Sequence, residues 1–141
     1  MIRTTRSAGS IRAGDALPVL ERTFTAVDLV AYGAATWDWH RLHYDIDYAK
    51  SRNLPGPIID GQAFGALLAR AAMEWAGPRA FMTRLAFRVK SMAFAGATLR
   101  AAGSVVAIEP VQGGHKVVLA QQLTAGERVV AESTTELRLP E

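Results

Sequence analysis

The sequence predicts an α+β domain in which one long helix lies against an antiparallel sheet. Residues 61–75 place apolar side chains at a helical period, and four segments between residues 81 and 139 alternate as strands do. The chain has 141 residues, 50% of them hydrophobic, which is enough for one buried core. Packing the helix on the sheet is the economical way to bury the apolar faces of both.

The chain is expected to begin with a tail and a strand. We predict that residues 1–13 form a short flexible tail and that residues 14–141 form a single domain, because the folded pattern starts near Gly14. Alternation then predicts a first strand, carried by Leu17, Val19 and Thr23.

Two short helical segments are predicted next. Thr25 is a plausible N-cap for a helix over residues 25–35, and Asp28 stands three residues later, as the acidic member of a capping box does. Residues 45–51 predict a further helical turn. Two prolines and a glycine within residues 53–57 then prevent the helix from continuing.

The long helix and the strands follow without a linker or repeat. An apolar stripe at helical spacing predicts the helix, and its members are Phe64, Leu67, Leu68, Ala71 and Trp75. Gly77-Pro78 ends this helix. The strands are expected over residues 81–90, 98–108, 115–123 and 128–139.

Charge and cysteine content narrow the functional class. The net charge is +3 without a long basic run, and no apolar run approaches the ~20 residues of a membrane span. We therefore expect neither a nucleic-acid nor a membrane partner. The chain has no cysteine, which excludes disulfides, thiol nucleophiles and thiolate metal sites. Because small secreted domains usually need disulfides, we predict a cytoplasmic location.

The groups suited to acid–base chemistry are concentrated in residues 36–49. Asp38 and His43 can share proton transfer to and from one water molecule if they lie close together in a partly apolar setting. Five residues apart, they would face different ways on a continuous helix, so they converge only where the chain leaves the helix. The alternative is a structural pair, with the aspartate capping a turn.

Gly61 is a candidate for stabilising negative charge. A glycine in the first turn of a helix presents an unpaired N–H at the positive end of the helix dipole, and no Cβ hinders a ligand carbonyl. We predict that its amide forms an oxyanion hole. Asp60, Gln62, His40 and Trp37 lie beside these groups in the sequence and are predicted to bind or orient the substrate, although Asp60 can equally act only as a helix cap.

These residues resemble the motif of the MaoC-like branch of the hot-dog fold, which includes (R)-specific enoyl-CoA hydratases and 3-hydroxyacyl-thioester dehydratases. The family motif is Gly-Asp-x-Asn-Pro-(Ile/Leu)-His, followed five residues later by a small residue. The matching positions are Asp38, Leu42, His43 and Ala49. Three positions depart from the motif, with Trp37 for glycine, His40 for asparagine and Arg41 for proline. His-Arg at these places resembles a sub-branch that includes mesaconyl-CoA hydratases.

The second half of the family pattern is partly kept. The family has a proline-glycine loop followed by His-Gly at the start of the central helix, whereas this chain has Pro55-Gly56-Pro57 and then Asp60-Gly61. A carboxylate there opposes an anion developing nearby unless it is protonated or paired. The segment from Glu74 to Pro78 resembles MaoC-type proteins of steroid side-chain breakdown, some of which are heteromers.

The resemblance implies a hot-dog fold, with one long helix wrapped by a five- to six-stranded antiparallel sheet. It implies reversible addition of water to the double bond of a trans-2-enoyl thioester. Asp38 and His43 are then catalytic, and the Gly61 amide receives the thioester oxygen. The expected partners are an acyl-thioester substrate and a second copy of the chain, or another hot-dog subunit. No cofactor is expected beyond the coenzyme A or phosphopantetheine of the substrate.

Three other interpretations remain open from the sequence. A non-catalytic or half-active subunit of a heteromeric complex is favoured by Asp60 and Trp37. A hot-dog thioesterase usually has its carboxylate within the central helix, where this chain has only Glu74 near the end. A metal site could combine His40 and His43 with Asp38 or Asp45. We expect no resident metal, because histidines at this spacing near scattered aspartates often occur by chance.

Overall fold

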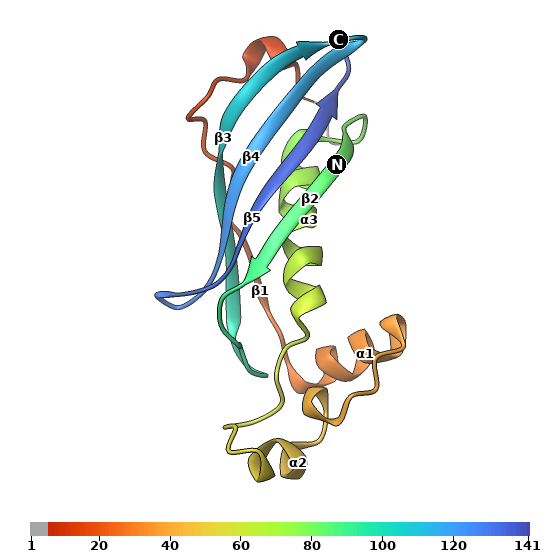
Figure 1. Cartoon of the computed structure of the whole chain (residues 1–141), viewed down its shortest axis with the longest axis vertical. Helices are drawn as coiled ribbons and strands as arrows, with labels where there is room; N and C mark the ends of the chain where they lie inside the picture. Colours follow the sequence, from red (N-terminus) through yellow and green to blue (C-terminus); the bar gives the residue numbers. More distant parts are fainter. Residues whose placement is uncertain (1–5) are drawn as a thin grey trace.

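The structure is a computed structural model that describes residues 6–141, and its centre is an antiparallel sheet (Figure 1). In the described part of the chain the sheet has five strands, in the order β1-β3-β4-β5-β2. The strands are β1 (Leu20–Thr23), β2 (Phe81–Val89), β3 (Thr98–Val111), β4 (Gly114–Ala125) and β5 (Arg128–Leu139). The four predicted C-terminal strands are therefore confirmed. Successive side chains of a strand point to opposite faces of the sheet, so the alternating sequence pattern identified them.

The long helix α3 (Gly61–Ala76) lies against one face of the curved sheet (Figure 1). The helix predicted over residues 61–75 is confirmed, and it continues for one more residue, to Ala76. Phe64 and Leu68 of the apolar stripe are 1% and 0% exposed. At the centre of this contact the Gln121 side chain donates to the Leu68 carbonyl, at 3.1 Å, and accepts from the Thr135 hydroxyl. The helix is therefore fixed on the sheet by apolar burial and by one fully satisfied polar contact.

Three shorter helices stand at the end of the sheet near the N-terminus of α3 (Figure 1). They are α1 (Ala26–Thr36), the 3₁₀ turn η2 (Arg41–His43) and α2 (Ile46–Ser51). The predicted capping box of α1 is confirmed, since the Asp28 N–H donates to the Thr25 hydroxyl and the Thr25 N–H donates to the Asp28 carboxylate. The helical turn expected over residues 45–51 is α2, capped by Asp45.

The N-terminal segment differs from its prediction. Within the stretch expected to be a flexible tail, residues 8–10 form the 3₁₀ turn η1 (Ala8–Ser10), and Ile11 is 2% exposed in the core. Burial of the Ile11 side chain fixes residues 6–13 on the domain. The part of the prediction that concerns residues 1–5 lies outside the described residues.

The first strand begins later than predicted. β1 starts at Leu20, whereas Leu17 is buried and donates its N–H to the Gly103 carbonyl outside the paired segment. The sequence pattern did not reveal the later start of β1, because Leu17 is apolar and would point inward whether or not it belonged to the strand. Within residues 6–141, helices that combine the length and the apolar character of a membrane span are absent.

Candidate active site

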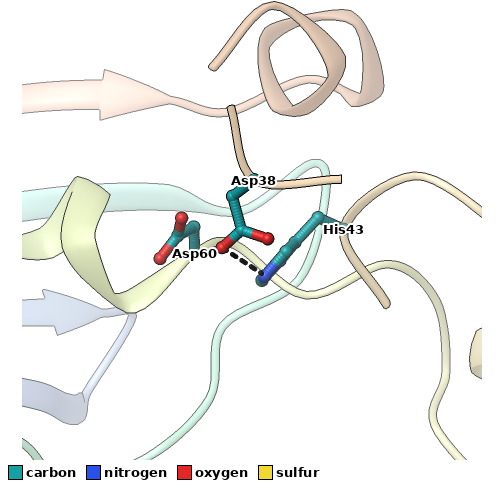
Figure 2. A group of neighbouring side chains, drawn as sticks. All are labelled: Asp38, His43 and Asp60. Atoms are coloured by element: carbon teal, nitrogen blue, oxygen red, sulfur yellow. Dashed lines mark ion pairs between the residues drawn. The ribbon is translucent and has the colours of Figure 1, made fainter. Parts of the chain in front are cut away.

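Asp38 and His43 come together directly after α1, as the sequence predicted. The helix ends at Trp37, whose φ of 60° is left-handed, and the chain then turns into η2. Nε2 of His43 lies 3.9 Å from Oδ2 of Asp38 (Figure 2). This separation is too long for a direct hydrogen bond but suits one water molecule that hydrogen-bonds to both atoms. Their catalytic role remains a prediction.

The His43 ring is held in one tautomer. Its Nδ1 lies 2.9 Å from the Ile58 carbonyl oxygen, and a carbonyl can only accept, so Nδ1 carries the proton that is donated. In the neutral ring, Nε2 therefore presents its lone pair toward Asp38. The neighbouring Ile58 N–H donates to the Leu42 carbonyl, which ties η2 to the segment before α3. With its side chain 14% exposed, His43 is well placed to accept a proton in a sheltered pocket.

Asp38 is positioned through its backbone and through one carboxylate oxygen. Its N–H donates to the Gly33 carbonyl in α1, at 3.0 Å. Its Oδ1 accepts from the His40 N–H, at 3.1 Å, and this leaves Oδ2 to face His43. Gly33 allows the turn, because a Cβ there would lie 2.7 Å from the Asp38 carbonyl oxygen. The orientation of Asp38 is therefore set by α1 as well as by the loop.

Asp60 completes the group of side chains at this end of the domain (Figure 2). It caps α3, with Oδ1 accepting from the Gln62 N–H at 2.8 Å, so its predicted capping role is confirmed. The other oxygen, Oδ2, is buried and has no hydrogen-bond partner among residues 6–141. One ligand atom each from Asp38, His43 and Asp60 lie within 4.8 Å of one another. Asp60 is thus more than a cap, because it also lines the pocket beside these two residues.

These three side chains line one pocket. Its other lining residues are Phe24, Leu29, Tyr32, Gly33, Ile59 and Ala63. Apolar walls with a few convergent polar groups are typical of small-molecule sites. Burial, and next the negative charge of Asp60, raise the pKa of Tyr32 above its usual value. Its hydroxyl therefore keeps its proton at neutral pH. The sequence did not single out Tyr32, because one aromatic residue in a short helix resembles a core residue.

The remaining predicted site residues lie around the pocket rather than in it. His40 uses Nδ1 to accept from the Leu42 N–H and its backbone N–H to hold Asp38, so it orients the aspartate. Gln62 is exposed and contributes its N–H to Asp60. Gly61 lies in the first turn of α3, and a Cβ there would reach only Val89, at 3.4 Å. A Cβ at Gly61 would therefore meet a single side-chain atom at van der Waals distance.

Trp37 contributes no wall to the pocket, and its side chain is 81% exposed. Its backbone is left-handed, a conformation that glycine adopts without strain and that costs a residue with a Cβ about 1–2 kcal/mol. The predicted role of Trp37 in binding or orienting the substrate remains a prediction. The indole packs edge-on against Trp39, with ring centroids 6.1 Å apart.

Replacing Trp37 by glycine is expected to stabilise the protein by about 1 kcal/mol, because it removes the left-handed strain at a largely exposed side chain. The free energy of unfolding in urea measures this. Trp37→Ala is the matched control, since alanine loses the indole but keeps the Cβ. Equal stabilisation by both substitutions would show that backbone strain at Trp37 is not the cause.

Comparison with known proteins identifies the family. The model of the MaoC like domain matches residues 12–127 of the 141 residues. The chain belongs to the MaoC-like domain family. No curated protein matches its sequence.

The fold of this MaoC-like chain is shared with several solved structures. The (R)-hydratase from A. caviae involved in PHA biosynthesis is 21% identical, with a TM-score of 0.84 over 93% of this chain and 98% of the other. The R-hydratase PhaJ1 from Pseudomonas aeruginosa is 20% identical, with a TM-score of 0.83 over 96% and 86%. The ChsH1-ChsH2 complex from Mycobacterium tuberculosis contains a chain that is 24% identical, with a TM-score of 0.78 over 91% and 98%. The predicted hot-dog fold is therefore confirmed.

Proposed function

We propose that this protein is an (R)-specific hydratase or dehydratase that adds water to, or removes it from, an enoyl thioester of coenzyme A or of an acyl carrier protein. The observation that carries the proposal is the 3.9 Å gap between His43 Nε2 and Asp38 Oδ2, at a pocket that Asp60, the N-cap of α3, also lines. The family and the solved (R)-hydratases support the same chemistry.

In the hydration direction, a water molecule held between the two side chains loses a proton to His43 Nε2, whose lone pair is free. The hydroxyl oxygen bonds to Cβ, and the electrons of the double bond move toward the thioester oxygen. The Gly61 N–H donates a hydrogen bond to the thioester oxygen as negative charge develops on that oxygen. Return of a proton from the Asp38–His43 pair to Cα on the same face completes a syn addition. Dehydration is the reverse sequence.

The direct test is the ultraviolet absorbance of the conjugated enoyl thioester on mixing purified protein with crotonyl-CoA and bulkier trans-2-enoyl-CoAs. Loss of the band with formation of the (R)-3-hydroxyacyl product is the expected result. An unchanged band across the panel, also in the reverse direction from (R)-3-hydroxyacyl-CoA, would contradict a hydratase that acts by itself.

A methyl group at Gly61 tests the oxyanion hole. Gly61→Ala is expected to lower kcat/KM by about 10²–10³-fold, because the new Cβ stands where the thioester oxygen must approach the amide. The free energy of unfolding should barely change, since within the protein the Cβ meets only Val89 Cγ2 at van der Waals distance. Steady-state kinetics and urea unfolding measure the two effects separately. Full activity in a folded variant would exclude this amide N–H as the hydrogen-bond donor to the thioester oxygen.

The second candidate is a half-active subunit of a heteromeric hydratase. The observation in its favour is the buried, unpartnered Asp60 Oδ2 beside Gly61, because a carboxylate there opposes an oxyanion. The likeness to a chain of the ChsH1-ChsH2 complex points the same way. Co-purification with a second hot-dog protein, with activity only in the complex, would distinguish this candidate from the first.

A dimer is our proposal for the assembly. Strand β2 is an edge of the sheet and exposes apolar side chains, with Phe81 at 68%, Val89 at 47% and Phe87 at 38%. An exposed apolar edge strand is a template for pairing with another strand. Light scattering of the purified protein tests this. The cytoplasmic location remains a prediction from the absence of cysteine.

A thioesterase is less well supported by the site. Its expected carboxylate in the central helix would be Glu74, which forms an ion pair with Arg70 at 2.8 Å, near the opposite end of α3 from Gly61. Release of free thiol from acyl-CoA, followed with a thiol reagent, separates this activity from hydration.

A further inference from the structure

We propose that Asp38, His43 and Asp60 form a binding site for a divalent cation of the Zn²⁺ class. One nitrogen and two carboxylate oxygens from these residues lie within 4.8 Å of one another at the pocket. Binding of the cation follows from the structure alone and does not depend on the proposed function.

The first argument is the way in which each side chain is held. His43 Nδ1 donates to the Ile58 carbonyl, Asp38 Oδ1 accepts from the His40 N–H, and Asp60 Oδ1 accepts from the Gln62 N–H. In each residue, one polar atom is thus fixed by the backbone, and the three side chains lie close together (Figure 2). This is the outer-shell arrangement that orients metal ligands, in which the second nitrogen of a ligating histidine donates to a carbonyl.

The second argument is charge. Two carboxylates line the pocket, and no lysine or arginine of residues 6–141 lines it. Asp60 Oδ2 is buried without any hydrogen-bond partner in that range, which is costly for a charged oxygen. A divalent cation would neutralise both carboxylates and give this oxygen its partner.

The third argument is the choice of cation. An imidazole nitrogen with carboxylate oxygens suits Zn²⁺, and three protein ligands leave a fourth position for water. With bonds of about 2.0–2.2 Å, the ligand atoms of a tetrahedral ion lie roughly 3.4 Å apart. His43 Nε2 and Asp38 Oδ2, which are 3.9 Å apart, would close by about 0.5 Å around such an ion, and the other ligand atoms, which lie within 4.8 Å, would close further. Mg²⁺ prefers oxygen ligands alone and is expected to bind far more weakly.

This site differs from the metal site considered from the sequence. His40 uses its Nδ1 to cap η2, and Asp45 forms an ion pair with Arg41 at 2.7 Å. The Tyr48 N–H, and next Arg41, hold the pKa of the Asp45 carboxyl below its usual value. Asp60 takes their place, although it lies 17 residues after His43 in the sequence, because the N-terminus of α3 faces the turn after α1.

The test is calorimetric titration of the chelator-treated full-length protein with Zn²⁺. We expect one ion per chain, and Asp60→Asn should weaken binding by at least about 10-fold, since it removes one ligand charge while keeping the acceptor that caps α3. His115→Asn is the matched control for zinc on another histidine and should leave binding unchanged. No heat at millimolar Zn²⁺, or binding that Asp60→Asn leaves intact, would overturn the proposal.

A second measurement, nuclear magnetic resonance of the histidine rings in the wild-type protein, tests the site even if a variant folds poorly. In the wild-type protein, Zn²⁺ should shift the ring resonances of His43 more than those of His40 and His115. A larger shift at either of the other histidines would exclude the proposed site. If the proposed hydratase is correct, bound Zn²⁺ also occupies Nε2 and blocks proton transfer, so the metal should inhibit turnover and a chelator should restore it. Binding without inhibition would contradict the hydratase mechanism and leave the metal site standing.

Discussion

Substitution of His43 by alanine, or of Asp38 by asparagine, is expected to lower kcat/KM for hydration by about 10²–10⁴-fold in each case. His43→Ala removes the lone pair that accepts the proton of water. Asp38→Asn keeps an oxygen to accept the His40 N–H but removes the charge that faces Nε2 across 3.9 Å. Steady-state kinetics on an enoyl thioester that the wild-type protein converts measures both effects.

Two controls separate lost chemistry from lost structure. Asp47 is exposed on α2, so Asp47→Asn should leave kcat/KM unchanged, and His115→Asn on β4 should do the same. Urea unfolding should show that the pocket variants stay folded. Because the two residues act on one water molecule, the double variant should lose little more activity than the worse single variant. Fully additive losses, or activity retained in either single variant, would argue against a shared water.

The order of the elements could be predicted from the sequence because each depends on a local pattern. The stripe from Phe64 to Trp75 identifies α3, and Thr25 with Asp28 marks the start of α1 within one residue. The N-terminal segment was missed, since a single apolar residue such as Ile11 has no period and its burial depends on distant parts of the fold.

The candidate site was only partly predictable. Asp38, His43 and Gly61 carry recognisable chemistry at a known spacing, and the structure places the first two at one pocket. The left-handed backbone of Trp37 was not predicted, because it cannot be inferred from the identity of a bulky residue. The second oxygen of Asp60 and the hydroxyl of Tyr32 became relevant only when α1 and the start of α3 were brought together.

Gly33→Ala is the prediction that links this fold to its chemistry. In an ordinary helix interior, alanine is favoured over glycine by about 0.8–1.0 kcal/mol. Here the new Cβ would lie 2.7 Å from the Asp38 carbonyl oxygen, a backbone atom that no side-chain rotation can move. We therefore expect the opposite sign, with the free energy of unfolding lowered by about 1–3 kcal/mol, as for other overpacked sites. Stabilisation by this substitution would show that the backbone of the turn after α1 can shift to accommodate the new Cβ at little cost in free energy.

The same substitution should displace Asp38 and so reduce kcat/KM, although Gly33 donates and accepts nothing in the reaction itself. Gly33 is thus a positioning residue, and a double-mutant cycle can demonstrate it. In an Asp38→Asn background, Gly33→Ala should still destabilise the protein but should cost little further activity, because the group it moves no longer contributes. Gly61→Ala is the matched comparison, since it acts on the thioester oxygen and should lower kcat/KM in both backgrounds. If Gly33→Ala lowered activity equally in both backgrounds, its effect would not pass through Asp38, and the turn after α1 would have to act on the pocket by another route.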